Sequence, residues 1–246
     1  MISFLGLCVR NFIQTMKYIL GGNAKTGDII SKAAMISYDS IPIALSIVFI
    51  AAVVIALQIS KQFLMSGAES YVGGFLAVAL VRELAPGFAA LAISARAGTA
   101  ISAEIANMQV TSQVDAIKTL KVDPVGYYFA PRIIAGGLTV PMIVILAELF
   151  GILGGMIISY VTIGLHPNRY MSSVWQWLNT RDIYISILKG FIFGIIIPLV
   201  CATQGYETTG GAKGVGISTT QAAIKATVFL LMADLIVTLL FYIDPM

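Results

Sequence analysis

Two oppositely charged residues, Arg82 and Glu83, stand next to each other inside an apolar run of the sequence. An ionisable side chain at membrane depth is costly, so it usually pairs with an opposite charge or faces a wet cavity. A guanidinium can hold a phosphate with two parallel hydrogen bonds. The pair therefore has two interpretations: it fixes helix packing through ion pairs, or it lines a cavity and meets a polar headgroup. Adjacent helical residues point about 100° apart, so the two side chains cannot face one ligand equally.

The apolar run that precedes this pair carries three large residues on one helical face. Ile55, Ile59 and Phe63 follow an i, i+4 spacing, so their side chains line up on one side of a helix. They are candidates for the apolar part of the same cavity. Ordinary contact with lipid or with the protein core is the alternative.

A polar segment at residues 104–121 follows the charged pair. Its apolar residues recur on one loose side, which indicates a short helix outside the membrane. A surface helix between two spans is what a membrane subunit needs to dock an energy-supplying partner. The candidates for that contact are Glu104, Gln113, Asp115 and Lys118. The alternative is that these polar residues are simply solvated.

The remaining titratable residues do not form a catalytic pattern. Glu148 and Asp234 are further carboxylates inside apolar runs, for which helix packing is the default interpretation. Residues 22–26 differ from a phosphate-binding loop, since Ala24 stands where that loop needs a glycine before Lys25. Without a nucleophile, metal or cofactor constellation, the sequence argues against an enzyme. We expect any ATP to be bound by another chain.

The composition indicates that lipid is the solvent of this chain. Of its 246 residues, 58% are hydrophobic and 11% are charged, whereas a soluble domain has about 25% charged residues. A net charge of +3 without a long basic run does not suggest nucleic-acid binding. The two cysteines, Cys8 and Cys201, lie far apart and are expected to be buried free thiols.

The helices that position these residues are predicted from the apolar runs of the sequence and from the residues that interrupt them. Apolar residues at helical spacing over residues 2–20, opposite a basic side, predict an amphipathic helix that lies on the membrane surface, packs on the protein, or does both. Runs of about the length that crosses a bilayer occupy residues 41–60 or on to 65, 71–99, 133–163, 183–202 and 221–243. Pro124 and Pro131 are expected to break the chain before the third run, and residues 166–182 and 204–220 to be loops. The sequence thus predicts an all-α polytopic membrane protein.

The distribution of lysine and arginine gives the orientation of the spans. Basic residues precede the first span and gather around the segment after the second, whereas the opposite side has fewer. By the positive-inside rule, the N-terminus and the 104–132 segment lie in the cytoplasm and the C-terminus lies outside. An odd number of spans agrees with this arrangement.

Six short motifs, in order, carry a resemblance to a known family: Arg82-Glu83-Leu84-Ala85-Pro86, Ala95-Arg96-Ala97-Gly98, Ala103-Glu104-Ile105, Val122-Asp123-Pro124, Pro131-Arg132 and Gln204-Gly205-Tyr206. Over residues 35–243 the chain resembles the MlaE/YrbE family, the permease subunits of MCE-associated ABC lipid transporters. Two departures occur. Ala85 stands where the family usually has glycine, and residues 60–62 are more polar than a lipid-lined wall is expected to be.

The resemblance implies a single permease domain over residues 1–246, with an interfacial helix at 1–21, five spans and a cytoplasmic coupling helix at 104–121. It implies a homodimer in the bacterial inner membrane that joins two cytoplasmic ABC ATPase subunits and a periplasmic hexamer of MCE proteins. Such a complex moves phospholipids between the inner and outer membranes. ATP is then bound by the ATPase partner, and the permease itself needs no cofactor.

The resemblance also implies roles for the candidate residues. Those that match positions near the lipid cavity are Arg82, Glu83, Ile55 and Phe63. Those that match the helix coupled to the ATPase are Glu104, Gln113, Asp115 and Lys118. A membrane scaffold that anchors the ATPase and MCE subunits, without a transport path of its own, is the alternative function.

Overall fold

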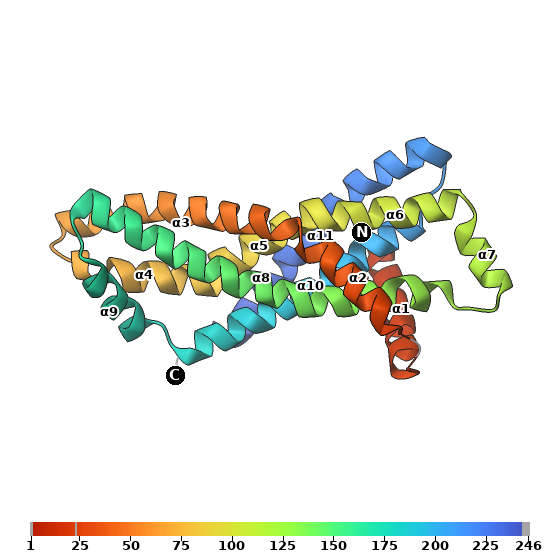
Figure 1. Cartoon of the computed structure of the whole chain (residues 1–246), viewed down its shortest axis with the longest axis horizontal. Coiled ribbons are helices and arrows are strands. Elements are labelled where there is room, and N and C mark those ends of the chain that lie inside the picture. The colour runs from red at the N-terminus through yellow and green to blue at the C-terminus, as the bar shows by residue number, and fades with distance from the viewer. Residues whose placement is uncertain (1, 23, 243–246) are drawn as a thin grey trace.

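The computed structural model describes residues 2–22 and 24–242, and all regular structure in these two ranges is helical (Figure 1). The helices outside the second span are α1 (Ile2–Leu20), α2 (Thr26–Ser37), α3 (Ser40–Met65), α7 (Gln113–Thr119), α8 (Pro124–Ile163), α9 (Pro167–Trp177), α10 (Thr180–Tyr206) and α11 (Gly211–Tyr242). The second span is one continuous helical stretch built from η1 (Glu69–Tyr71), α4 (Val72–Ala79), η2 (Leu80–Leu84), α5 (Ala85–Ile93), η3 (Ser94–Gly98) and α6 (Thr99–Val110).

Five of these stretches are long and apolar enough to cross a membrane, and they confirm the predicted all-α, polytopic fold. They are residues 26–65, 69–110, 124–163, 180–206 and 211–242. The 40 residues of α8 extend about 60 Å, at roughly 1.5 Å per residue. This length is twice the thickness of the hydrocarbon core of a bilayer, which is about 30 Å. α8 is therefore much longer than the hydrocarbon core is thick. The short helices α7 and α9 lie at opposite ends of the bundle (Figure 1).

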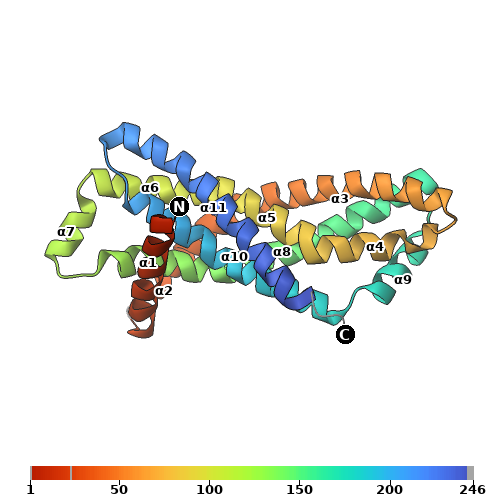
Figure 2. The ribbon, with the colours of Figure 1, turned by 180° about the vertical axis from the view of Figure 1, so that it is seen from behind.

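The N-terminal helix α1 crosses the bundle at a steep angle near the α7 end (Figure 2). One side of α1 is buried on the protein, where the Asn11 amide donates to Thr203 Oγ1 at 3.2 Å and the Gln14 amide to Asp123 at 2.7 Å. Packing on the protein is therefore confirmed. The other side still exposes apolar residues such as Val9 and Ile13, so contact of α1 with the membrane surface stays a prediction.

One of the two predicted proline breaks is confirmed and the other is wrong. The chain leaves helical geometry between Thr119 and Pro124, and Pro124 begins α8, where the Asp123 carboxylate accepts from Val125 N and Gly126 N as an N-cap. Pro131 lies inside α8, where the flanking turns keep the helix continuous. Two segments predicted as loops contain α9 and the first turns of α11.

The predicted coupling segment at residues 104–121 is not one helix. Glu104 belongs to α6, which extends the second span, whereas Gln113, Asp115 and Lys118 belong to α7. The chain turns between them at Ser112, which has a left-handed backbone with φ 59°. A residue in that conformation cannot continue an α-helix, so the segment bends away from the span.

Glycines allow α8 to approach its neighbours closely. A side-chain carbon at Gly155 would lie 2.7 Å from Tyr170 Oη, and one at Gly151 would lie 2.8 Å from Leu80 Cδ2. The closest crossing joins α8 to α10, where a carbon at Gly136 would collide with the carbonyl oxygen of Gly194. Small residues at such crossings let helix backbones touch in a membrane.

Candidate functional site

The centre of the candidate site is Lys189 of α10, whose side chain is 0% exposed. Its Nζ lies 2.8 Å from Glu83 Oε2, 2.7 Å from Asp234 Oδ1 and 2.8 Å from the carbonyl oxygen of Arg82. Nζ also lies 2.9 Å from Thr238 Oγ1, which in turn donates to Glu83 Oε1 at 2.9 Å. One ammonium thus ties the second, fourth and fifth spans together.

Arg82 takes part in a second ion pair beside the first. Its Nε donates to Asp182 Oδ1 at 2.9 Å and its Nη2 donates to Asp182 Oδ2 at 3.3 Å, so the pair is bidentate. Tyr242 of α11 donates its hydroxyl to the same carboxylate at 3.1 Å and places its ring 4.6 Å from the guanidinium carbon. Asp182 also accepts from the backbone of Asn179 at the start of α10. These bonds fix the guanidinium in position.

The two sequence neighbours bond to different partners and stay partly open. The side chains of Arg82 and Glu83 are 35% and 40% exposed, whereas that of Asp182 is 2% exposed. The cluster therefore has a buried floor and an accessible outer side, and it is not sealed inside the helix bundle. Helix packing through ion pairs and contact with a polar ligand are both compatible with this geometry.

The sequence alone does not identify the partners of Arg82 and Glu83. Of the residues in these two ion-pair networks, only Arg82, Glu83 and Asp234 stand out in the sequence, and Asp234 only as a packing carboxylate. Asp182 is 100 positions from Arg82, and Lys189 is 106 positions from Glu83. No spacing rule within one helix links residues so far apart. A buried lysine in an apolar run does need a carboxylate, and that need was the only signal available.

A helical turn of unusual geometry carries the charged pair. Residues Leu80–Leu84 (η2) form a π-helical turn, and a second one occurs at Ser94–Gly98 (η3), where Arg96 pairs with Asp39. π-Turns insert an extra residue into an α-helix and are frequent at functional sites. Two of the three motifs that carry the family resemblance in this span, those at residues 82–86 and 95–98, therefore include residues where the helix is locally widened.

The apolar candidates Ile55 and Phe63 are half-buried on α3. Phe63 packs against Phe75 of α4, with ring centroids 5.7 Å apart. α3 and α4 run antiparallel. Ile55 lies eight residues before Phe63, and Glu83 lies eight residues after Phe75, so each is about 12 Å along its helix from the aromatic contact and in the same direction. Ile55 thus lies at about the level of the charged cluster, while Phe63 lies nearer the α9 end.

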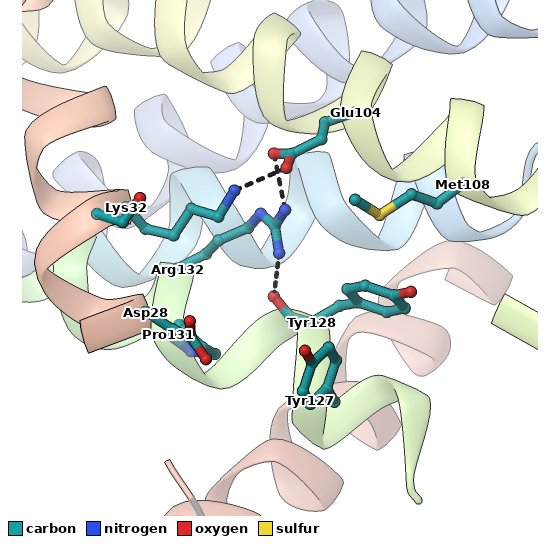
Figure 3. A pocket seen from close by; sticks show the side chains of 9 residues that line it. Asp28, Lys32, Glu104, Met108, Tyr127, Tyr128, Pro131 and Arg132 are labelled. Carbon is teal, nitrogen blue, oxygen red and sulfur yellow. Dashed lines mark hydrogen bonds and ion pairs between the residues drawn. The ribbon is translucent and has the colours of Figure 1, made fainter. Parts of the chain in front are cut away.

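A second cluster joins three spans at the α7 end. Lys32 Nζ of α2 and Arg132 Nη2 of α8 each lie 2.7 Å from a carboxylate oxygen of Glu104, and Arg132 Nη1 donates to the carbonyl oxygen of Tyr128 at 2.5 Å (Figure 3). These groups border a pocket of about 250 Å³, which Asp28 also lines. The pocket carries two cations and two carboxylates, so its charge favours neither an anion nor a cation.

In this cluster Glu104 is ion-paired and not simply solvated, while its role in coupling to an ATPase stays a prediction. Its carboxylate is enclosed by Lys32 and Arg132, and the Arg132 side chain is only 3% exposed. Glu104 therefore holds the spans together. About 21 residues of continuous helix separate it from Glu83, which corresponds to roughly 30 Å. A movement of one cluster along this helix would reach the other.

The three remaining coupling candidates lie on α7 and are exposed. Lys118 Nζ donates to Asp115 Oδ1 at 2.8 Å, and this hydrogen bond raises the pKa of Lys118. Gln113 donates to Thr111 Oγ1 at 3.1 Å. These interactions are local to α7 and its preceding turn, so the outer surface of α7 remains free to contact another protein.

Among the described residues, no group of three or more His, Cys, Asp or Glu side chains is placed to hold a metal ion. The two cysteines, Cys8 and Cys201, are buried free thiols, as expected.

Comparison with known proteins gives a consistent result. The family model described as Permease MlaE matches residues 29–240. A probable ABC transporter permease protein of Synechocystis is 34% identical over 229 residues, which cover 93% of this chain and 87% of that protein. Another from Rickettsia prowazekii is 35% identical over 214 residues, covering 87% and 83%. The Arabidopsis thaliana chloroplast protein TRIGALACTOSYLDIACYLGLYCEROL 1 is 34% identical over 186 residues, covering 76% of this chain and 53% of that protein.

Proposed function

The chain belongs to the MlaE permease family, and we propose that it is the subunit that carries phospholipids between the inner and outer membranes in an ATP-driven ABC transporter. As an ABC transporter permease it is a multi-pass membrane protein. Beyond family membership, the proposal specifies the cargo, the two membranes and the assembly of the transporter. Two copies of the chain enclose the lipid between them, and other subunits supply energy and receive the cargo.

The observation that carries the proposal is the partly exposed guanidinium of Arg82. The buried Asp182 carboxylate accepts from only two of its nitrogens, which leaves further N–H donors for a second acceptor. A phosphodiester is an acceptor of suitable geometry, and a guanidinium fixed in place loses little entropy on binding it. Arg82 thus supports recognition of a phosphate at membrane depth. The name of the Arabidopsis relative is that of a glycerolipid, which supports a lipid cargo.

Two apolar residues of α3, Ile55 and Phe63, support binding of the lipid tails. Ile55 lies at about the level of Glu83, and Phe63 packs on Phe75 towards the α9 end. In the proposed dimer, Arg82 holds the phosphate and this apolar wall contacts the acyl chains. Glu83 is held by Lys189 and Thr238 and sets the polarity beside the phosphate.

The proposed route of energy runs from α7 to the charged cluster. An ABC ATPase binds ATP and docks on Gln113, Asp115 and Lys118 of α7, which places that end of the bundle in the cytoplasm. The basic residues near that end, Lys32, Lys118 and Lys121, agree with a cytoplasmic position. Movement of α7 acts on the long helix that contains Glu104 and Glu83, and so reshapes the lipid cavity. A hexamer of MCE proteins receives the lipid at the α9 end.

The lipid contact is tested with the double variant R82Q/D182N. Removing Arg82 alone would leave the buried Asp182 carboxylate unpaired and destabilise the protein, whereas the double variant removes both charges. We expect less phospholipid to co-purify with the double variant, as measured by mass spectrometry. K61Q, at an exposed lysine of α3, is the matched control. Undiminished phospholipid in R82Q/D182N, with normal folding, would count against the role of Arg82.

The docking contact is tested with the charge reversal D115R on exposed α7. We expect weaker co-purification of the ATPase subunit and a lower ATPase rate, because the docking surface changes sign while the membrane spans are untouched. E69R, at the opposite end of the bundle, is the control. An ATPase that binds and hydrolyses ATP normally with D115R would remove the docking claim.

Reconstitution of the complex into vesicles separates transport from the scaffold alternative. If ATP changes the distribution of labelled phospholipid between donor and acceptor membranes, the permease takes part in transport. If the complex assembles and hydrolyses ATP but lipid does not move, the chain is an anchor for its partners.

A further inference from the structure

The pocket bordered by Lys32, Glu104 and Arg132 contains a hydrogen-bond donor that no described residue satisfies (Figure 3). Arg132 lines the pocket and is only 2% exposed. Its Nη1 and Nη2 bond to the Tyr128 carbonyl oxygen and to Glu104, whereas its Nε is buried and has no hydrogen-bond partner in the described ranges. A buried donor without an acceptor costs free energy, so this guanidinium needs an oxygen from a bound molecule. The transport mechanism proposed above assigns no ligand to this pocket.

The charges of the pocket lie on two different sides. Lys32 and Arg132 reach towards Glu104, whereas Asp28 and Tyr127 lie on the side away from Glu104 (Figure 3). The Lys32 ammonium bonds to Glu104 at 2.7 Å and has further N–H donors. With Nε of Arg132, these donors can bind the oxygens of a phosphate. The Asp28 carboxylate is exposed and takes no part in the ion pairs of Lys32 and Arg132, so it is open to a cation.

Two tyrosines add an aromatic surface that also favours a cation. Tyr127 and Tyr128 both line the pocket, and their rings pack edge to face with centroids 5.2 Å apart. The face of an aromatic ring attracts an ammonium group, and Tyr127 is 38% exposed. A simple anion would satisfy only the side of Lys32 and Arg132, and a simple cation only the side of Asp28. A molecule that carries both charges satisfies both sides.

The position of the pocket along α8 corresponds to the headgroup layer of a bilayer. Arg132 lies eight residues after Pro124, the first residue of α8, which is about 12 Å along the helix. A helix of about 60 Å centred on a hydrocarbon core of about 30 Å extends about 15 Å beyond it at each end. Arg132 then lies a few ångströms outside the core. Ile30 of α2, two residues from both Asp28 and Lys32, is 64% exposed, as expected of a residue that faces lipid.

The size of the pocket suits a headgroup without its acyl chains. The volume is about 250 Å³. At about 30 Å³ for each non-hydrogen atom, which is the liquid volume of a water molecule, the pocket holds on the order of eight such atoms. A phosphate joined to ethanolamine has this size. The acyl chains of such a lipid would lie outside the pocket, in the bilayer.

We propose that this pocket binds a zwitterionic phosphate ester of an amino alcohol, in the form of a phospholipid headgroup such as phosphoethanolamine. The phosphate bonds to Lys32 and to Nε of Arg132, and the ammonium group lies between Asp28 and the ring of Tyr127. The ligand thereby joins α2 to α8. The site is separate from Arg82, because Glu104 and Glu83 are about 30 Å apart along one helix. The proposal rests on the membrane location of the chain but not on ATP-driven transport.

The test measures which phospholipids the full-length chain retains in a maltoside detergent without ATP, by native mass spectrometry. The probes are equimolar phosphatidylethanolamine and phosphatidylglycerol with identical acyl chains, since the second has the phosphate but lacks the ammonium group. We expect the wild type to retain phosphatidylethanolamine with a preference of roughly tenfold, which corresponds to about 1.4 kcal/mol. Equal retention of the two lipids by the wild type would overturn the proposal.

Variants of the two charged sides make the test specific. D28N removes an exposed carboxylate and should abolish the preference, whereas E207Q, at an exposed carboxylate outside the pocket, is the matched control and should keep it. K32Q removes the phosphate contact and should lower retention of both lipids, while Arg132 remains as the partner of Glu104. Should D28N fail to fold, Y127L replaces it and should also reduce the preference. An unchanged preference in D28N or Y127L, or unchanged retention in K32Q, would refute the site.

Glycerophosphoethanolamine, which has the headgroup but no acyl chains, distinguishes a membrane source from a soluble one. Its affinity is measured by isothermal titration calorimetry with the same protein. Weaker binding than that of phosphatidylethanolamine supports the lipid, whose chains contribute to affinity. Binding as tight as that of the lipid would contradict the membrane source and identify a soluble ester as the ligand. Because Arg82 and Asp182 are unchanged and no ATP is present, failure of this test leaves the proposed transport function standing.

Discussion

Replacing Lys189 with methionine tests whether the charged cluster holds the spans together. Methionine has a similar length but no charge, so it leaves the carboxylates of Glu83 and Asp234 without their shared cation. It also removes the hydrogen bonds from Nζ to the Arg82 carbonyl oxygen and Thr238. The perturbation is therefore electrostatic, and the packing volume changes little.

The size of the effect follows from the burial of the partners. Breaking a buried ion pair typically costs about 3–5 kcal/mol, because the remaining charge stays unpaired. Lys189 is fully buried, but Glu83 is 40% exposed and Asp234 is 21% exposed, so solvent can relieve part of the cost. We therefore expect K189M to lower the free energy of unfolding by about 3 kcal/mol, near the lower end of this range. The double variant K189M/D234N, which also removes one of the two carboxylates, should recover about half of the loss.

The assay is unfolding in mixed micelles by SDS titration, followed by tryptophan fluorescence. K61M, at an exposed lysine, serves as the control and should unfold like the wild type. If K189M unfolds at the same SDS fraction as the wild type, Lys189 does not stabilise the bundle. If K189M/D234N is no more stable than K189M, the uncompensated Asp234 carboxylate is not the cause of the loss.

Three further changes are expected to alter the same unfolding free energy. G136A forces a carbon into the α8–α10 crossing and should cost about 1–3 kcal/mol, whereas G87A, with open space around it, should cost nothing. E104Q leaves the nearly buried Arg132 guanidinium without its carboxylate and should cost about 3 kcal/mol; a loss no larger than that of an exposed Glu→Gln change would contradict this. D123A removes the N-cap of α8 and should cost about 1 kcal/mol, and D123N, which keeps a capping oxygen, should cost less.

The two charged clusters lie on one continuous helix, and this arrangement suits a coupled transporter. Glu83 anchors the helix to α10 and α11, and Glu104 anchors it to α2 and α8. Each carboxylate bonds to a lysine or arginine on another span, so a shift of the helix cannot occur without exchanging ion pairs. Ion pairs at helix interfaces have discrete arrangements, as a two-state device requires.

Much of the fold could be predicted because it depends on local sequence. The apolar runs, each about long enough to cross a bilayer, predicted five spans, and the periodicity of residues 2–20 predicted α1. The helix ends were less accurate. The break at Pro124 was predicted correctly, whereas Pro131 lies inside α8, because a proline inside a long packed helix can be accommodated.

For the candidate site, the sequence by itself determined which residues are out of place in an apolar run, and therefore that Arg82 and Glu83 require partners. It also predicted that the polar segment after the second span lies outside the bilayer. Only the tertiary structure decided who the partners are: Asp182 for Arg82, Lys189 for Glu83, and Lys32 with Arg132 for Glu104. The physical reason is that the free-energy cost of a charged side chain in an apolar run depends on that residue and its local sequence. A pairing depends on how separate helices rotate and pack, which glycine contacts such as Gly136 against Gly194 fix.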